Sequence, residues 1–297
     1  MGDKKKYLQK KIGAFLYRML GLIKYSEFLY FLKMKEKIDL KNPQKFNEKL
    51  MWLKIYTQNP LKSQCADKYA VRDYLIKKGE GACLNKLYGV YDSSKEINWD
   101  ELPHAFVLKV NNASGAIIVC EDKETLNREA TSKKIDRWLK ENYYTYYAEP
   151  HYQAIPPQLI CEKYLKSGTH SVPVDYKFYC FDGIPKVMMM CVQRETGHPK
   201  FYLCDLEGTI LPYNQAGKEA LKEGIYKVEL PATISEMCRI SKNLASEFPF
   251  VRMDYYEING AVVFGEMTFT PSACLDSNLH LEGELEMGEM INLPIQI

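Results

Sequence analysis

The chain has 297 residues, of which 46% are hydrophobic and 26% are charged. These values are ordinary for a globular protein and exclude a disordered chain, a collagen and a repeat array. The nine cysteines include no C-x-x-C pair, so neither zinc nor thioredoxin chemistry is indicated. The start of the chain does not have the pattern of a secretory signal peptide, and we expect a cytoplasmic protein with reduced thiols.

Positive charge is concentrated at the start of the chain. The net charge is +2, but residues 1–54 hold 14 Lys and Arg against 5 Asp and Glu, a balance of +9, and the remaining 26 basic and 33 acidic residues give −7. Apolar residues recur in this head at helical spacing: Ile12, Phe15, Leu16, Met19, Leu20 and Ile23. The run is too short and too charged to span a bilayer.

Two interpretations of this basic helix stay open. It can pack on the body with its lysines in solvent, or it can lie on an anionic membrane surface, where each nearby Lys or Arg contributes about 1 kcal/mol. No recognised nucleic-acid motif accompanies the basic residues, so we expect no nucleic-acid partner.

The rest of the chain alternates helical and strand-like patterns. Asn42-Pro43 and Asn59-Pro60 break the helical head. Helices are predicted over residues 46–55, 65–76, 125–147, with Thr125 as a cap, and 235–247. Strands are predicted over 106–110, 116–120, 158–164, 176–181, 185–192, 251–258 and 261–267. Asp182-Gly183 and Asn259-Gly260 each separate two strand-like runs and predict hairpins.

This order predicts an α+β protein: a helical head, a strand–loop–strand with a helix, and a larger antiparallel region. A Rossmann domain is not indicated, because no G-x-G-x-x-G follows a strand. The chain also lacks the G-x-x-x-x-G-K-[ST] pattern of P-loop proteins.

The second hairpin carries the residues that best suit a metal site. Asp254 and Glu266 lie six residues before and after Gly260. If they share a face, their carboxylates can hold Mg²⁺ together with substrate phosphates. Arg252 would share the face of Asp254 and hold an anion beside the metal. The alternative is an exposed hairpin face with ordinary charges. However, no Lys occurs in residues 252–271, and Glu266 follows an apolar run.

The same segment resembles the metal motif of ATP-grasp ligases, such as D-alanine–D-alanine ligase. That motif reads Arg-x-Asp, a hairpin, then Glu-x-Asn-x-x-Pro-Gly. This chain has Arg252-x-Asp254 and then Glu266-x-Thr268-x-x-Pro271-Ser272, with Thr268 in place of Asn and Ser272 in place of Gly. The resemblance implies Asp254, Glu266 and Thr268 as Mg²⁺ ligands and Arg252 as a catalytic residue.

Four upstream segments resemble the family's nucleotide site in the same order. Asp67-Lys68-x-x-x-Arg72 and the strand ending at Lys109 resemble the segments that place basic side chains on ATP phosphates, and Lys109 is the second candidate catalytic residue. Residues 112–115 resemble the small-residue loop over the phosphates, and 161–165 the strand that binds adenine. The implied ATP-binding residues are Arg72, Lys109, Ser114, Gly115, Glu162, Lys163, Leu165 and, for the ribose, Asp175.

A closer resemblance is to the TupA-like, teichuronopeptide-biosynthesis group of ATP-grasp proteins, from gene clusters for bacterial surface polysaccharides. Residues 42–54, 66–72, 175–183 and 248–254 resemble that group, which usually has His where Asn112 stands. The resemblance implies the ATP-grasp fold, two α+β subdomains whose antiparallel sheets clasp ATP. Its expected parts are a basic helical region at 1–60, the phosphate-binding part at 61–165 and the metal hairpin part at 166–297.

The implied activity is ATP- and Mg²⁺-dependent joining of a carboxylate to an amine, through an acyl phosphate and with release of ADP. The implied partners are ATP, an amino acid or other amine, and a uronic-acid glycan or its lipid-linked precursor at the inner face of the plasma membrane. Candidate substrate residues are Lys177, Arg194 and His198. Four tyrosines at positions 143, 144, 146 and 147 either stack on a sugar or pack at a helix end.

Two other classes of protein stay open. A glycosyltransferase would fit the same gene clusters, but a D-x-D metal motif does not occur in the sequence. A kinase or a degenerate nucleotide-binding module on the same fold would account for Thr268 and for the glycine-poor loop at 112–115.

Overall fold

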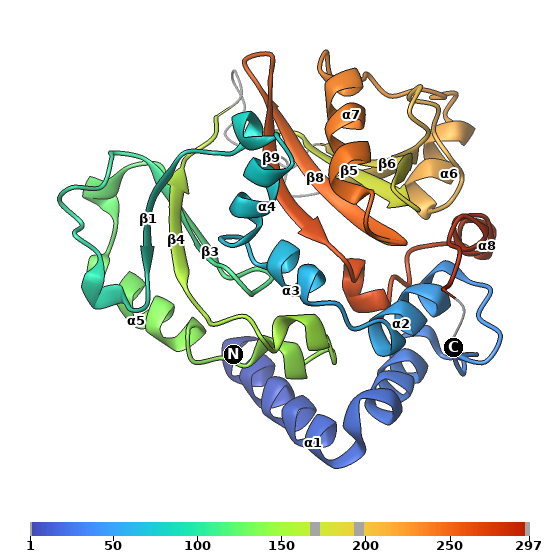
Figure 1. Ribbon diagram of the computed structural model, residues 1–297, viewed down its shortest axis with the longest axis horizontal. Helices are drawn as coiled ribbons and strands as arrows, with labels where there is room; N and C mark the ends of the chain where they lie inside the picture. The colour runs from blue at the N-terminus through green and yellow to red at the C-terminus, as the bar shows by residue number, and fades with distance from the viewer. Residues whose placement is uncertain (1, 167–172, 193–198, 295–297) are drawn as a thin grey trace.

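A computed structural model describes the backbone of residues 2–166, 173–192 and 199–294, and the side chains from residue 10 onward within those ranges. The candidate substrate residues Arg194 and His198 lie outside the described residues. Two antiparallel sheets form the body, and helices cover their outer faces (Figure 1).

The large sheet has five strands in the order β7-β6-β5-β8-β9. They are β5 (Asp175–Phe181), β6 (Ile184–Val192), β7 (Lys200–Cys204), β8 (Phe250–Ile258) and β9 (Ala261–Thr268). Helix α7 (Ile234–Ala245) covers one face, where Phe178, Met253 and Tyr255 point into a shared apolar core. Because side chains alternate along a strand, the neighbours of these residues point to the opposite face.

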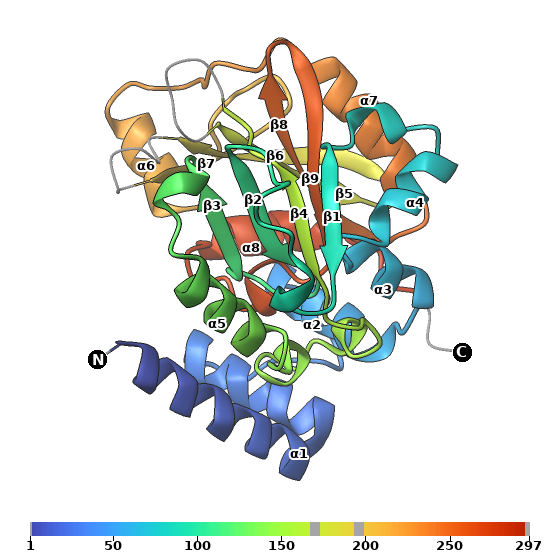
Figure 2. The ribbon, with the colours of Figure 1, turned by 90° about the vertical axis from the view of Figure 1, so that its left-hand side faces the viewer.

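The small sheet has four strands in the order β1-β4-β2-β3 and lies in front of the large sheet in Figure 2. They are β1 (Leu87–Tyr91), β2 (Phe106–Val110), β3 (Ile117–Cys120) and β4 (Leu159–Lys163). Helix α5 (Arg128–Trp138) closes a separate core against this sheet, in which Ile135 packs near Phe106 and Leu108.

Two short helices, α3 (Pro60–Ala66) and α4 (Val71–Lys77), connect the head to the small sheet. The turn between them is fixed to the loop after β2: the Asn111 amide donates to Asp67 Oδ1 at 3.0 Å, and the Lys68 backbone N–H donates to the Asn111 carbonyl at 3.2 Å. This turn therefore positions the predicted phosphate loop.

The head consists of α1 (Gly2–Met34) and α2 (Phe46–Tyr56). Helix α1 bends at Gly21, whose φ of 73° and ψ of 176° suit glycine and strain any residue with a Cβ atom. Helix α2 begins with Glu48 accepting hydrogen bonds from two preceding backbone N–H groups, which caps its first turn. It packs on α8 (Leu281–Glu289), where Glu284 accepts the Asn47 backbone N–H at 2.9 Å.

The remaining elements are α6 (Gln215–Lys222) and the short 3-10 turns η1 (Gly81–Cys83), η2 (Ser94–Glu96), η3 (Lys123–Thr125), η4 (Tyr143–Thr145), η5 (Pro150–Tyr152) and η7 (Pro271–Cys274). Within the described parts of the chain, none of the helices is both long and apolar enough to cross a membrane.

The α+β class, both hairpins and the helices at 46–55 and 235–247 are confirmed. The single helix predicted over 65–76 is wrong, because Asp67 accepts the Tyr69 N–H and turns the chain. The helix predicted over 125–147 is too long. Asn127, not Thr125, caps α5, which ends at Trp138. Strands β1 and β7 and helices α6 and α8 were not predicted. The division of the chain at residues 60 and 165 stays a prediction.

Candidate active site

Charged side chains line one face of the large sheet across three neighbouring strands. In the register of these strands, Lys177 of β5 lies opposite Asp254 of β8, and Asp254 lies opposite Glu266 of β9. Alternation along the strands adds three more polar residues to this face: Asp175, Arg252 and Thr268. The opposite face is the apolar one under α7, so the sheet divides a core from a charged surface.

Asp254 is the most buried of these charges, with 4% of its side chain exposed. The Arg252 guanidinium donates two hydrogen bonds to it, each 2.7 Å long. The Lys177 ammonium donates a third at 2.6 Å. A buried carboxylate needs such partners, because loss of hydration without compensation costs several kcal/mol.

A β-bulge at Gly265 brings Glu266 opposite Asp254. Next to the turn, Ile258 pairs with Ala261. If this pairing continued without interruption, Gly265 would lie opposite Asp254, and Glu266 would lie opposite Met253 with its side chain facing the core. The register shifts by one residue at Gly265 and turns Glu266 to the charged face. A Cβ atom at Gly265 would lie 2.9 Å from the Asp254 carbonyl oxygen, so the bulge requires glycine.

Glu266 lies among positive charges. Its Oε2 is 3.4 Å from the Lys68 ammonium, and its Oε1 is 3.6 Å from Arg252. Burial tends to raise the pKa of Glu266, but the charges of Lys68, Arg252 and Lys177 outweigh it and lower that pKa to about 2. Glu266 is therefore ionised at neutral pH.

Asp175 and Lys177 form an ion pair of 2.6 Å beside Asp254. Burial and the negative charge of Asp254 raise the pKa of Asp175. Burial tends to lower the pKa of Lys177, but the two aspartates outweigh it and raise that pKa. Lys177, a candidate substrate residue, is thus held between two carboxylates. The Oδ1 atom of Asp175 is buried and has no hydrogen-bond partner among the described residues, so it can accept a ligand hydroxyl.

A second charged cluster lies between the small sheet and α4. Glu162 on β4 is 2.9 Å from the Lys109 ammonium and 3.7 Å from Arg72. The structure therefore brings three predicted nucleotide-binding residues together. The three side chains pair with one another, although the family resemblance implied that Arg72 and Lys109 bind phosphates and that Glu162 binds adenine.

Four other predicted ATP-binding residues lie at or beyond the ends of strands in the small sheet. Ser114 and Gly115 lie in the exposed turn before β3, where Gly115 has a φ of +74°. Lys163 is exposed at the end of β4, and Leu165 is half-buried beyond it. Of these four, Ser114 lines the cleft described next.

A cleft of about 950 Å³ opens over the charged face of the large sheet. Its floor contains Arg252, Glu266 and Thr268. Its walls come from the loop at residues 112–115, from the aromatic segment at 143–152, from the segment after β9 and from α1. Among the wall residues are Asn112, Ser114, Tyr143, Tyr146, Tyr147, Tyr152, Asp276, Asn278, Lys10, Leu29 and Lys33. The cleft thus joins elements from both sheets and from the head.

The aromatic wall is fixed from two sides. The Lys54 ammonium of α2 donates to the Tyr147 carbonyl at 3.1 Å, and the Thr270 hydroxyl donates to Glu149 at 2.5 Å. The Lys10 ammonium lies 4.8 Å from the centre of the Tyr146 ring. The sequence left open whether the four tyrosines stack on a sugar or pack at a helix end. In the structure Tyr143, Tyr146 and Tyr147 line the cleft, and Tyr144 packs against Tyr17 of α1.

Lys68 was missed as a site residue. Its ammonium donates to the Ala113 carbonyl at 3.0 Å and reaches Glu266, so it links the loop at residues 112–115 to the hairpin of β8 and β9. Its position in the Asp67-Lys68 motif was the available signal. The contribution of α1 to the cleft had no such signal.

The residues present fit Mg²⁺. Among the residues that the structure describes, no three His, Cys, Asp or Glu side chains gather into a metal-binding group. Mg²⁺ needs no such group, because it takes one or two carboxylates and completes its shell with water and substrate phosphates. Asp254 and Glu266 supply two oxygen-ligand side chains on one face. The Thr268 hydroxyl is within hydrogen-bond distance of both Arg252 and Glu266.

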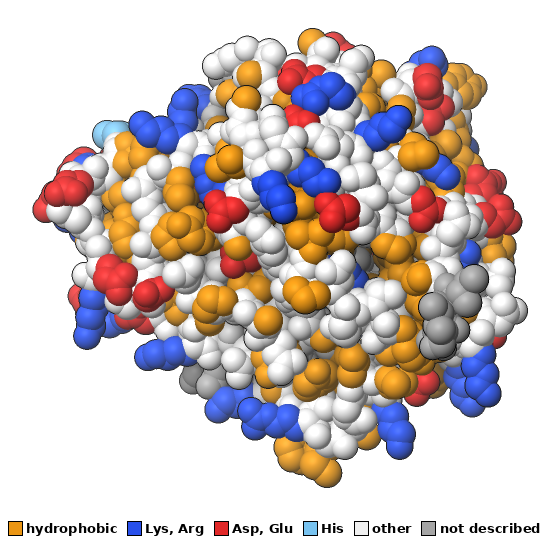
Figure 3. Space-filling view, viewed as in Figure 1, with side chains coloured by type: hydrophobic (Ala, Val, Ile, Leu, Met, Phe, Trp, Pro, Cys, Tyr) orange, Lys and Arg blue, Asp and Glu red, His pale blue; other side chains and the backbone are white. Residues whose placement is uncertain are grey.

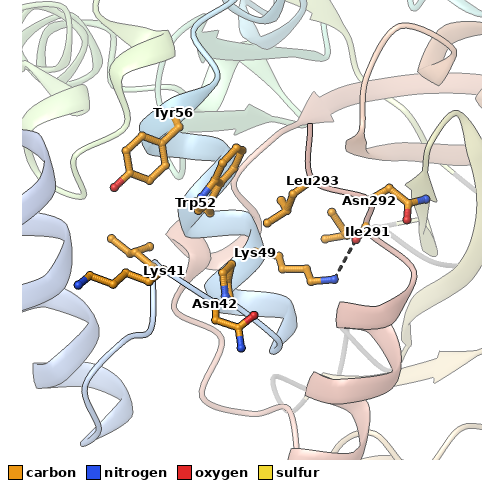
Figure 4. Close-up of a pocket in the computed structure, with 10 residues that line it drawn as sticks. Lys41, Asn42, Lys49, Trp52, Tyr56, Ile291, Asn292 and Leu293 are labelled. Atoms are coloured by element: carbon orange, nitrogen blue, oxygen red, sulfur yellow. Dashed lines mark hydrogen bonds between the residues drawn. The ribbon is translucent and has the colours of Figure 1, made fainter. Parts of the chain in front are cut away.

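A second hollow of about 670 Å³ lies between α2 and the end of the chain, away from these charges. Figure 4 shows Trp52 and Tyr56 along α2, and the Lys49 ammonium reaching the Ile291 carbonyl at 2.9 Å. Its lining contains no carboxylate and no residue predicted for the site.

A family model described as TupA-like ATPgrasp matches residues 48–292. A search of curated proteins gives no match. Among solved structures, D-alanine–D-alanine ligase from Bacillus anthracis complexed with ATP has 16% identity and a TM-score of 0.42, over 76% of this chain and 64% of the ligase. This chain therefore spans only 64% of that enzyme's length.

Two further solved structures are similar at the same level. D-Alanine–D-alanine ligase from Helicobacter pylori has 14% identity and a TM-score of 0.43, over 84% of this chain and 67% of the ligase. D-Cycloserine synthetase has 12% identity and a TM-score of 0.43, over 78% of this chain and 70% of the synthetase. At these identities and scores, nothing about substrates follows from the likeness.

The bulge can be tested with Gly265→Ala. The added methyl group would collide with the Asp254 carbonyl, so we expect a loss of about 1–3 kcal/mol in the free energy of unfolding, measured in urea. Gly81→Ala is the matched control, because its methyl group would meet the flexible Ile76 side chain at 3.2 Å. A Gly265→Ala protein as stable as the wild type would contradict the assigned role of this glycine.

The charge of Glu266 can be tested by pH. Because folding lowers the pKa of Glu266 from 4.5 to about 2, its contribution to stability is complete above about pH 5 and is lost as the pH falls toward 2. The wild type should exceed Glu266→Gln in stability by a margin that shrinks between about pH 5 and 3. Glu207→Gln, at an exposed carboxylate, is the control. A margin that stays constant over this range would show that Glu266 is not held ionised by its neighbours.

Proposed function

The chain belongs to the TupA-like ATP-grasp family, and from this premise we propose that it is an ATP- and Mg²⁺-dependent carboxylate–amine ligase. One observation carries the proposal: Asp254 and Glu266 lie opposite each other on the charged face of the large sheet, Glu266 lines the cleft, and Arg252 lies between their oxygens. Two opposed carboxylates beside a fixed guanidinium suit a metal-bound triphosphate and the anionic intermediate formed from it.

The other charged residues of the site would bind ATP. Lys109 and Arg72 would leave Glu162 and neutralise ATP phosphates, and Lys68 would contact them from the loop side. The unpartnered Oδ1 of buried Asp175 would accept a ribose hydroxyl. Mg²⁺ at Asp254 and Glu266 would neutralise charge on the phosphate oxygens during transfer.

The reaction proceeds in two displacements. An oxygen of the substrate carboxylate attacks the γ-phosphorus of ATP, the bond from that phosphorus to the bridging oxygen breaks, and ADP leaves. The amine nitrogen then attacks the acyl carbon of the acyl phosphate, the C–O bond to phosphate breaks, and the amine proton passes to solvent. Arg252 would stabilise the oxyanion of this second step, and the protein's main contribution would be positioning and charge neutralisation.

The aromatic part of the cleft supports a uronic acid as the carboxylate substrate. Tyr147 is 52% exposed and lines the cleft together with Lys10 and Lys33. Tyrosine rings offer apolar faces to a sugar, and lysines offer charge to its carboxylate. The acceptor would be a glycan of the bacterial surface or its precursor, and the amine an amino acid. All nine cysteines are free, which supports a cytoplasmic location.

The activity can be tested by ADP release from Mg²⁺-ATP with a panel of uronic acids and pooled amino acids. We expect ADP when acid and amine are both present, and a loss of at least about a hundredfold in Glu266→Ala, because one side of the metal site is removed. Glu207→Ala, at an exposed acid, should retain wild-type activity.

The other classes of protein predict different results in the same assay. ADP formed with the acid alone, and no product trapped by hydroxylamine, would identify a kinase. Binding of a nucleotide sugar without binding of ATP would identify a glycosyltransferase and reject the ligase.

The acceptor wall can be tested with Tyr147→Ala. Removal of the ring should raise the KM for the uronate about fivefold to tenfold, with the KM for ATP unchanged, because the ring would contact the acceptor only. Tyr226→Ala, which removes a tyrosine that is also exposed, is the control. An equal rise in both KM values would place the effect on the fold and not on the acceptor.

A further inference from the structure

Helix α1 presents large apolar side chains to solvent along its whole described length. On the arm before the bend, Phe15 is 62% and Met19 is 68% exposed. On the arm after it, Phe28 and Phe31 are also exposed. Such residues at helical spacing on an exposed face indicate a surface that another body covers.

The opposite side of α1 is attached to the body. Tyr25 and Tyr30 are buried, and the Tyr25 hydroxyl donates to the Tyr146 carbonyl at 3.2 Å. The Tyr17 ring packs edge-on against Tyr144. The body therefore fixes which side of α1 faces outward. On that side Phe15, Met19 and Phe31 stay largely exposed, while Phe28 stacks in part on Tyr25 of the same helix.

The bend at Gly21 makes this surface protrude. Figure 3 shows hydrophobic surface at the lower edge of the molecule, over the bend of α1 seen in Figure 1, with Lys and Arg on both sides. Exposed Leu20 and Ile23 flank the bend, and Arg18 and Lys24 are exposed next to them. Residues 10–34 hold five basic residues and one acidic residue, a balance of +4.

We propose that this face of α1 docks on an anionic lipid bilayer, with the bend inserted at the interface. An apolar protrusion bordered by basic side chains matches a surface that is apolar within and negative at its headgroups. The charge disfavours a second copy of the chain as the occupant, because two faces with a balance of +4 would repel each other.

The docking face adjoins the cleft. Leu29 and Lys33, on the arm of α1 after the bend, line the same cleft as Arg252 and Glu266. A bilayer under α1 would therefore lie beside the acceptor end of the site. It follows, resting here on the proposed function, that the acceptor is presented on a lipid carrier.

The test is co-sedimentation of the full chain with vesicles of phosphatidylcholine and phosphatidylglycerol, compared with phosphatidylcholine alone. We expect binding to the anionic vesicles that weakens as ionic strength rises from about 0.1 to about 0.5 M. Phe15→Ser with Met19→Ser should weaken partition by about tenfold or more, because both changes remove apolar area from the interface. The independent pair Arg18→Glu with Lys24→Glu should do the same without removing apolar area.

The matched control is Ile76→Ser with Ile184→Ser, two exposed isoleucines outside α1, which should leave vesicle binding unchanged. Wild-type protein that does not bind anionic vesicles would overturn the proposal, as would α1 variants that bind like the wild type. Self-association that Phe15→Ser and Met19→Ser abolish, without vesicle binding, would assign the face to a second copy instead.

Vesicle binding needs neither ATP nor a substrate, so its outcome is separate from that of the ligase assay. Docking without ADP release would leave the membrane surface established and reject the proposed function. ADP release with a water-soluble uronate but without docking would support the proposed function and reject the membrane surface.

Discussion

The bulge at Gly265 determines which side of the large sheet receives the carboxylate of Glu266. Residues directly opposite in antiparallel strands share a face, so a one-residue shift exchanges the core side for the cleft side. Without it, Glu266 would lie opposite Met253 in the core under α7, where an unpaired charge costs several kcal/mol. With it, Glu266 lies opposite Asp254 and contacts Lys68 and Arg252, and these contacts of Glu266 depend on that register.

The charged face of the large sheet, taken together with Lys68, is electrically balanced before any ligand binds. Three carboxylates, of Asp175, Asp254 and Glu266, are matched by three cations, of Lys68, Lys177 and Arg252. A metal cation entering between the carboxylates would displace the lysine and arginine side chains, and phosphates arriving with the metal would give those side chains new partners. The site therefore favours ligands that bring both signs of charge together, which a metal–nucleotide complex does and a free metal ion does not.

The sequence predicts what is local and misses what depends on tertiary contacts. Asn259-Gly260 identifies the hairpin, but a regular two-residue turn gives the wrong partner for Glu266, and only the isolated Gly265 signals a bulge. Strand β1 escapes prediction because its five residues are all half-buried and show no alternation. Helix α8 carries two glycines, Gly283 and Gly288, which weaken its helical pattern. The pairing of Arg72 and Lys109 with Glu162 joins segments that no local pattern relates.

The two ends of the cleft come from different parts of the chain. The family match covers residues 48–292, which contain the carboxylates, the loop at 112–115 and the aromatic wall. Lys10, Leu29 and Lys33 come from α1, before the matched region, and line the cleft beside the tyrosines. The charged residues of the site therefore lie within the matched region, while the head lines the end of the cleft beside the tyrosines. Because the body holds Tyr25 and Tyr30 of the same helix, a surface that binds α1 from outside would be rigidly placed relative to Arg252. The bend at Gly21 then has two consequences at once: it presents the apolar side chains outward, and it leaves the following arm over the cleft.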